Sequence, residues 1–393
     1  AYLVCGERTA LVDTVDACFT GRLLANVRER LGDRPLDYLV INHMEPDHSA
    51  SIAAVRQAYP AVRIVGNAKT LQMIEGYYGI ACGTVEVKEG DVLDLGGLTL
   101  AFCMIPMVHW PETMATWCAE ERTIFSGDAF GTFGALNGGV TDEQLDVEPF
   151  WEEMRRYYAC IVGKYGQPVQ RALAKVAPLD IAMICSTHGP VWRREIARVV
   201  ELYDKVSRYE GEPGAVIAYG SMYGNTEQMA ETVARGLAAA GVRPIVVYNL
   251  STADVSQVLR DIFRYDTLVV GSPTYYAGPN GSLCAILDRL FYSAGELLRF
   301  KPAAAVAVCR RGGASATFDR LNKYFTINNM PVVSSQYWNS VHGRLPGEAT
   351  QDAEGMQTMR TLGDNMAWLL KNIQTGKIPL PEPEEPVRTN FIR

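Results

Sequence analysis

Short apolar runs alternate with polar, glycine-bearing segments over the first 208 residues of the chain. Helical patterns separate these runs, and the clearest of them covers residues 149–164. The first five residues are also strand-like, so the chain is expected to start inside a strand. Runs with the length and composition of buried β-strands lie at residues 38–41, 100–105, 123–127 and 181–184.

A polar stretch with Pro and Gly at residues 209–214 interrupts this alternation, and we interpret it as a linker. A second series of strands and helices follows, which predicts a doubly wound parallel sheet. Residues 225–240 carry an apolar stripe at helical spacing. We therefore expect a first domain at 1–208 and a second at 215–393, with an extended, Pro-rich surface tail at 378–386. The predicted strands of the second domain are 215–219, 245–247, 268–270 and 303–308.

The composition of the 393 residues agrees with two globular domains, because 48% are hydrophobic and 21% are charged. A net charge of −7 argues against nucleic acid as a partner. No apolar run approaches the roughly 18 residues that a membrane helix needs. The chain begins with Ala1 and shows no secretory leader. We expect a cytoplasmic protein whose N-terminus is trimmed or incomplete.

Nine cysteines are scattered along the chain, and no two of them form a CxxC pair. Most of them lie inside apolar stretches. We therefore expect buried free thiols in a reducing compartment instead of disulfides or an iron–sulfur cluster.

The strongest chemical signal is a run of four possible metal ligands directly after the apolar run 38–41. Further candidates follow the apolar runs 100–105, 123–127 and 181–184 in the same way. Reactive groups in layered α/β folds gather on the loops at one end of the strands. The alternative is a polar turn whose histidines are only hydrogen-bonded. The candidate ligands are His43, Glu45, Asp47, His48, His109, Asp128 and His188.

Seven ligands are too many for one tetrahedral ion. They suit two ions that share a carboxylate bridge, at a separation of roughly 3.5–4 Å. Carboxylate oxygens mixed with imidazole favour iron or manganese, while ligand type alone leaves zinc open.

Two loops of the second domain have the character of a flavin site. The loop 220–226 joins a strand to a helix and is rich in Gly and hydroxyl residues, which favours a phosphate at the helix N-terminus. It contains neither the Lys of a Walker A loop nor a GxGxxG fingerprint, so a monophosphate such as that of FMN fits best. The loop 271–278 follows the next strand and offers aromatic rings for a flavin ring, although ordinary strand–helix turns remain the alternative. The expected flavin-binding residues are Ser221, Met222, Tyr223, Gly224, Asn225, Thr226, Pro273, Thr274, Tyr275, Tyr276, Ala277 and Gly278.

Together these residues resemble the flavodiiron protein family, also called A-type flavoproteins. In that family a metallo-β-lactamase-like αββα sandwich with a diiron centre precedes a flavodoxin-like FMN domain. The family's H-x-E-x-D-H motif matches residues 43–48, and its remaining ligands match His109, Asp128 and His188. Our hypothesis is that His43, Glu45 and His109 hold one iron, that Asp47, His48 and His188 hold the other, and that Asp128 bridges them. His48 is the least secure of these ligands.

The resemblance implies reduction of O2 to water, of NO to N2O, or of both. It also implies a head-to-tail homodimer in which the FMN of one subunit serves the iron pair of the other. No rubredoxin-like CxxC module follows, so the electron donor is expected to be a separate rubredoxin-like protein or a reduced cofactor. The segments 309–313 and 330–339 instead resemble NADPH-dependent FMN reductases and iron–sulfur flavoproteins. The first of these segments adds Arg310 and Gly312 to the expected flavin-binding residues.

Two other functions compete with this hypothesis. A zinc hydrolase of the metallo-β-lactamase superfamily fused to a flavin domain would use the metals to activate water. Glu45 argues against it, because those hydrolases more often have histidine there. A flavin electron carrier with a structural metal domain is the second, and Asp47 and Asp128 argue against it, because structural sites are closed and four-coordinate. The sequence does not separate O2 from NO as the substrate.

Overall fold

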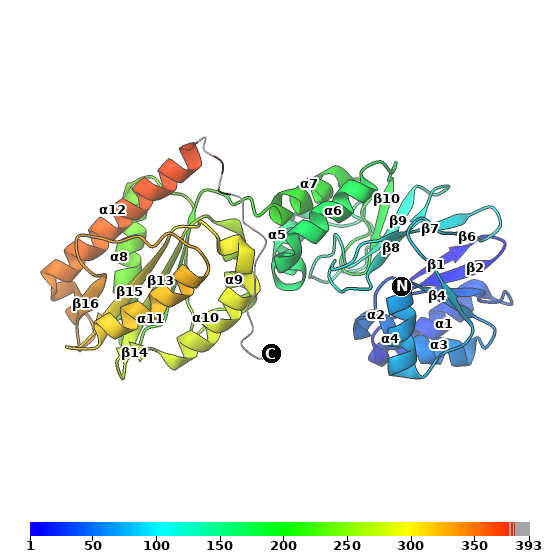
Figure 1. The fold of residues 1–393 in the computed structure, drawn as a ribbon, viewed down its shortest axis with the longest axis horizontal. Helices are drawn as coiled ribbons and strands as arrows, with labels where there is room; N and C mark the ends of the chain where they lie inside the picture. The colour runs from blue at the N-terminus through cyan, green and yellow to red at the C-terminus, as the bar shows by residue number, and fades with distance from the viewer. Residues whose placement is uncertain (377–378, 380, 382–393) are drawn as a thin grey trace, which may run out of the picture. The chain divides into compact units, whose positions relative to one another are not determined.

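The computed structural model describes residues 1–376 together with Pro379 and Pro381. The chain divides into two compact units, residues 1–210 and 211–393, and the division falls inside the segment interpreted as a linker. Figure 1 shows one α/β fold in each unit. Apart from those two prolines, the predicted extended tail at 378–386 lies outside the described residues.

The first unit contains two five-stranded sheets. The first sheet has the order β1 (Tyr2–Cys5), β2 (Thr9–Val12), β3 (Tyr38–Val40), β4 (Arg63–Gly66) and β5 (Thr84–Glu86). The second sheet has the order β10 (Met183–Ser186), β9 (Thr123–Gly127), β8 (Met114–Cys118), β7 (Thr99–Met104) and β6 (Val92–Asp94). The five apolar runs predicted as strands thus correspond to β1, β3, β7, β9 and β10.

Helices cover the outer face of each sheet (Figure 1). Those of the first sheet are α1 (Thr20–Leu31), α2 (Pro46–Ser49), α3 (Ile52–Ala58) and α4 (Ala68–Tyr78), with a 3-10 turn at Ala17–Phe19. Those of the second sheet are α5 (Glu148–Tyr157), α6 (Gly166–Val176) and α7 (Ile196–Ser207). A π turn (Tyr158–Val162) and a 3-10 turn (Gly163–Tyr165) connect α5 to α6.

Alternating side chains of the first sheet explain why this unit has two apolar layers. Val40 and Val65 point inward and pack against Phe102 of the second sheet. Their neighbours Leu39 and Ile64 point to the opposite face and pack under the helices. Successive strand residues face opposite sides, so each strand supplies both layers. The predicted αββα sandwich is confirmed.

The second unit contains one parallel sheet whose strands are ordered 2-1-3-4-5 by sequence, as in flavodoxin-like folds. Its strands are β12 (Ile245–Asn249), β11 (Ala215–Tyr219), β13 (Leu268–Tyr275), β15 (Ala303–Cys309) and β16 (Ser340–His342), and the short β14 (Gly278–Pro279) pairs antiparallel with β13. Its helices are α8 (Asn225–Ala239), α9 (Val255–Arg264), α10 (Gly281–Ala294), α11 (Ala314–Ile327) and α12 (Ala353–Thr375), with 3-10 turns at Gly295–Leu298 and Glu348–Gln351.

Helix α8 begins at the predicted residue and ends one residue before the predicted end. Its stripe of Met229, Val233 and Leu237 is completely buried in the core beneath α12. At Gly236 a β-carbon would lie 3.3 Å from the Cα of Gly363, so these two glycines allow the close approach of the helices. The predicted doubly wound sheet is confirmed.

The structure corrects two sequence-based expectations. The segment predicted as a loop from Gly271 is strand up to Tyr275, and only Tyr276 and Ala277 form the turn before β14. Pairing of β13 with β15 through Pro273 overrides the turn character of this stretch. The cysteines are all free, as expected, but only Cys118, Cys185 and Cys309 are buried. Four thiols are exposed, those of Cys5, Cys18, Cys82 and Cys160. An apolar sequence neighbourhood does not decide whether a given side chain faces the core or the solvent.

Among the described residues, we find no helix with the combination of length and apolar character that membrane crossing requires.

Candidate metal centre and flavin cleft

The seven candidate ligands lie on segments that follow strands of both sheets in the first unit. His43 follows β3, and the short helix α2 that comes next carries Asp47 and His48. Pro46 opens α2, where its fixed φ suits the first helical turn. Asp128 directly follows β9 after a left-handed glycine, Gly127, with φ of 62°.

The seven side chains form two groups, as the hypothesis from the sequence requires. The ligand atoms within each group all lie within 4.8 Å of one another. The first group is His43, Glu45, His109 and Asp128, and the second is Asp47, His48 and His188.

Asp128 lies between the two groups and is 1% exposed. Its Oδ2 atom is 3.0 Å from Nε2 of His109 and 3.4 Å from Nε2 of His43. Its Oδ1 atom is 2.9 Å from Nε2 of His48 and 3.4 Å from Nε2 of His188. Each carboxylate oxygen therefore faces one group, which is the arrangement that a bridging ligand needs.

A buried glutamate that is not among the predicted ligands holds His43 in place. Oε1 of Glu112 is 3.0 Å from Nδ1 of His43 and accepts a hydrogen bond from the Met44 amide at 2.9 Å. An ionised carboxylate accepts only, so Nδ1 of His43 carries the hydrogen and Nε2 is left to face the group. Glu112 lies three residues after His109, and this spacing is the one sequence signal for it.

The carboxylates hold positive charge on the histidines. Burial opposes the charged form of His43, but Glu112 and Glu45 outweigh it and raise the pKa of His43 to about 10. Burial likewise opposes charge on His188, and Asp128 and Asp47 raise its pKa to about 9. The neighbouring histidines His109 and His43 lower the pKa of Glu45 to about 2. The carboxylate charge is thus balanced by protons on the imidazole rings, and a bound cation would take the place of those protons.

Two buried atoms test whether these residues fit a metal. Nε2 of His43 and Oδ1 of Asp47 have no hydrogen-bond partner among the described residues. Buried polar atoms are almost always satisfied, so an orphaned atom in each of the two ligand groups fits a site that binds cations. Imidazole and carboxylate donors in two adjacent sets fit two iron ions.

Aromatic rings enclose the centre. The Trp110 ring lies edge-on to the His43 ring, with centroids 5.3 Å apart. The Tyr157 ring lies 5.5 Å from the His188 ring, and its buried hydroxyl has no hydrogen-bond partner among the described residues. Burial first, and then the Asp128 charge, raise the pKa of Tyr157 well above its usual value. Sequence reasoning missed Tyr157, because it comes from α5 and nothing in its spacing connects it with the ligands.

The second unit has a cleft of about 200 Å³ where strands β11, β13 and β15 end. Ligands bind at such a switch point of the strand order in doubly wound folds. Gly224, Tyr276, Ala277, Gly278 and Gly312 do not line it. The expected residues that do are Ser221, Met222, Tyr223, Asn225, Thr226, Pro273, Thr274, Tyr275 and Arg310, and sequence reasoning missed Val308, Cys309, Gly343 and Arg344.

The phosphate end of a flavin mononucleotide fits the start of α8. Gly224 adopts a left-handed φ of 81°, and its amide donates to Oγ of Ser221 at 3.1 Å. The free amides of the first helical turn and the guanidinium group of Arg310 would meet an anion there. The Asn225 side chain is already engaged, because it donates to the carbonyl of Leu345 at 3.0 Å.

Comparison with known proteins matches each unit to a protein family. Residues 1–189 match the ODP family beta lactamase, and residues 213–344 match NADPH-dependent FMN reductase. The nitric oxide reductase of Moorella thermoacetica is 33% identical over 277 residues, which are 70% of this chain and 69% of that protein. The anaerobic nitric oxide reductase flavorubredoxin of Escherichia coli is 31% identical over 327 residues, which are 82% of this chain and 67% of that protein.

Solved structures give the same result. Rubredoxin oxygen:oxidoreductase from Desulfovibrio gigas superposes with a TM-score of 0.87 at 26% identity, covering 96% of this chain and 91% of that one. The flavodiiron protein from Giardia intestinalis superposes with a TM-score of 0.84 at 21% identity, covering 94% and 90%, and this second likeness supports the fold alone.

Proposed function

Because this chain belongs to the flavodiiron protein family, we propose that it reduces O2 to water, NO to N2O, or both, with two iron ions and FMN as cofactors. The observation that carries the proposal is the position of Asp128 between two groups of histidine and carboxylate ligands. Two ions held side by side can act together on one small molecule.

The assignment of ligands follows the two groups. His43, Glu45 and His109 would hold one iron, and Asp128 would bridge to the other. The second iron would take Asp47, His48 and His188. A reduced iron pair supplies two electrons and FMN two more, which covers both the two-electron reduction of two NO and the four-electron reduction of O2.

The protein's own residues orient and enclose this centre. Glu112 holds the ring of His43 in one orientation and one tautomer. Nε2 of His43 therefore faces the first group without a hydrogen atom. Trp110 and Tyr157 pack against the rings of His43 and His188. Tyr157 keeps its phenolic proton because its pKa is raised, and its unpaired hydroxyl is a hydrogen-bond donor available inside the pocket.

The rival hydrolase hypothesis would favour a Lewis-acidic zinc pair. Glu45 contacts His109 at 2.9 Å, so a third carboxylate lies in the centre beside Asp47 and Asp128. Added negative charge reduces the Lewis acidity of a bound ion and stabilises the higher charge of oxidised iron. The geometry thus supports redox chemistry over hydrolysis.

The cellular location, the oligomeric state and the electron donor form the second part of the proposal. We place the enzyme in the cytoplasm as a head-to-tail homodimer, in which the flavin of one subunit serves the iron pair of the other. A separate rubredoxin-like protein or a reduced cofactor delivers the electrons.

Gas consumption by pre-reduced protein tests the proposal. Protein of verified iron and FMN content is reduced without oxygen and freed of excess reductant, and O2 or NO is added while an electrode follows each gas. We expect consumption of at least one gas, limited to the electrons stored in the protein, its loss in His109→Ala, and its retention in His342→Ala, which removes an exposed histidine of the other unit. If iron-loaded, FMN-containing protein consumes neither gas, the proposal is wrong.

A further inference from the structure

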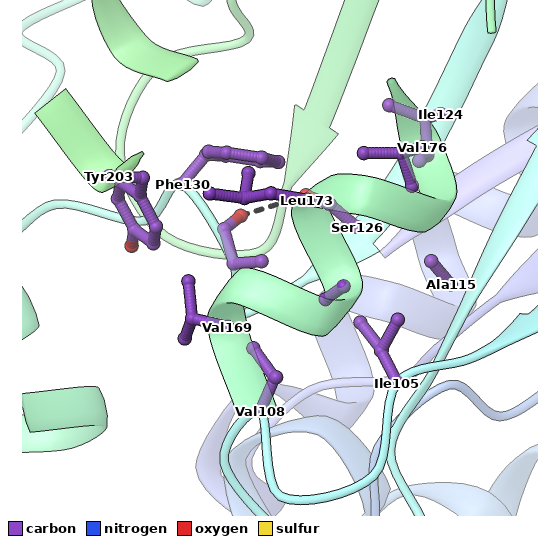
Figure 2. A pocket seen from close by; sticks show the side chains of 12 residues that line it. Ile105, Val108, Ala115, Ile124, Ser126, Phe130, Val169, Leu173, Val176 and Tyr203 are labelled. Atoms are coloured by element: carbon purple, nitrogen blue, oxygen red, sulfur yellow. Dashed lines mark hydrogen bonds between the residues drawn. The ribbon is translucent and has the colours of Figure 1, made fainter. Parts of the chain in front are cut away.

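An apolar cavity lies in the first unit, beneath helix α6 (Figure 2). Its lining includes Val169 and Leu173 of α6 and, on the segment after β7, Ile105 and Val108. Its volume is about 20 Å³. A space of roughly 10–15 Å³ suffices for one water-sized molecule, so the cavity has room for one diatomic molecule.

The chemistry of the walls disfavours water. The surface that lines the cavity is apolar throughout. Two wall residues carry hydroxyl groups. The Oγ atom of Ser126 donates to the carbonyl of Ala129 at 2.8 Å, the dashed line in Figure 2, and the Tyr203 hydroxyl adds no polar surface to the wall. A buried water needs two to four polar partners, and cavities without them stay dry and accept apolar gases such as xenon.

Two residues of the cavity wall are immediate sequence neighbours of metal ligands. Val108 immediately precedes His109, and Ala129 immediately follows Asp128. Val108 is 1% exposed and Ala129 is 7% exposed, so this part of the wall is deep in the protein. On α6, Ala172 and Leu173 are only half-buried, which makes this helix the side nearest to solvent.

We propose that this cavity, which we call the gas cavity, is a holding site for one molecule of an apolar diatomic gas on its way to the metal centre. The inference rests on the proposed function, because it assigns the substrate of that function to the cavity. The site binds weakly and without hydrogen bonds, since O2 and NO share small size and low polarity and the walls offer only dispersion contacts.

Xenon tests occupancy without any turnover. Crystals of the intact protein are pressurised with xenon, and the anomalous signal locates the bound atoms. We expect one xenon in the gas cavity of the wild type. Ala172→Leu should fill the space from α6 and remove the xenon, and Ala174→Leu, on the exposed side of the same helix, should keep it. Val169→Ala enlarges the cavity and should increase xenon occupancy, which provides an independent result if the leucine variant does not fold.

Kinetics then tests whether the site serves the reaction. Filling the gas cavity should raise KM for the gas by about threefold to tenfold while kcat is kept, the pattern of a lost binding step. A rise in KM for O2 alone, or for NO alone, identifies the gas that uses the cavity. Absence of xenon in the wild type, or loss of xenon with unchanged KM for both gases, overturns the proposal. These outcomes differ from failure of the proposed function, in which the wild type consumes neither gas but xenon binding can still be measured.

Discussion

The metal centre and the flavin cleft are built in opposite ways. Four of the seven proposed metal ligands are buried, His43, His48, His109 and Asp128, and the other three are half-buried. The flavin cleft is lined by loop residues near the surface, where Met222 is 47% exposed and Tyr223 is 58% exposed. One site depends on named side-chain atoms, and the other depends largely on the path of the backbone.

This difference determines how each site tolerates substitution. The buried carboxylate of Asp128 has at least two partners at each oxygen, and removing its charge leaves several histidines uncompensated. A backbone cradle loses at most one contact when one side chain is shortened. Single substitutions should therefore be severe in the first unit and mild in the second.

Replacement of Asp128 by Asn is the most severe test of this contrast. Asparagine keeps the shape but loses the charge that faces both ligand groups. We expect both irons to be lost together and gas turnover to fall by more than about 100-fold, beyond the range for supporting residues. Iron per chain is measured by mass spectrometry and turnover by electrode.

The control for this variant is Asp142→Asn, which alters another fully buried aspartate of the same unit. Asp142 accepts hydrogen bonds from the amides of Arg193, Arg194 and Glu195 and touches none of the ligands. The Asp142→Asn variant should keep both irons. If Asp128→Asn retained one iron and wild-type turnover, Asp128 would not be a bridge.

Removal of the metal should have the next largest effect. An ion present at 100 times its Kd stabilises the folded state by about 2.7 kcal/mol. For a unit of this size, that corresponds to a fall in Tm of roughly 5–10 °C. Circular dichroism before and after chelation measures the change, and added iron should reverse it. A Tm that stays constant although iron loss has been verified would show that the ligands are preorganised without the ions.

Much of this architecture could be predicted from the sequence because buried strands have a local signal. Apolar runs locate β3, β7, β9 and β10, and the residue types that directly follow these runs identify the metal ligands. Contacts between distant segments could not be predicted in this way. Glu112 meets His43 across 69 positions of sequence, and no local pattern encodes that approach.

The flavin unit shows the other limit of sequence reasoning. Gly271, Ser272 and Pro273 are turn formers, yet they lie in β13 because β15 pairs with them. Tertiary pairing overrides such weak local preferences. Arg344 lines the cleft from a segment more than 100 residues beyond the first flavin loop, so its contribution depends on how the chain returns to the sheet.

Glu112→Gln separates support of a ligand from ligation itself. Glutamine can still accept from the Met44 amide, but it removes the charge that polarises His43. Iron affinity should fall by about 10–100-fold, as for other residues that orient a ligating histidine. Competition with a chelator measures it, and Glu120→Gln, at an exposed position, is the control. Unchanged affinity would mean that the interior fixes His43 without this carboxylate.

Ser221→Ala should have the smallest effect, and it tests the backbone side of the contrast. The Ser221 hydroxyl accepts from the Gly224 amide at 3.1 Å and faces the cleft, so its loss removes one hydrogen bond to a phosphate while the helix amides remain. FMN affinity should fall by about tenfold, or roughly 1.4 kcal/mol, with iron content unchanged. Fluorescence quenching during titration of the FMN-free protein measures it, and Ser251→Ala, outside the cleft, is the control. A loss above about 100-fold would mean that the flavin cleft depends on single side chains as strongly as the metal centre does, and the contrast between the two regions would fail.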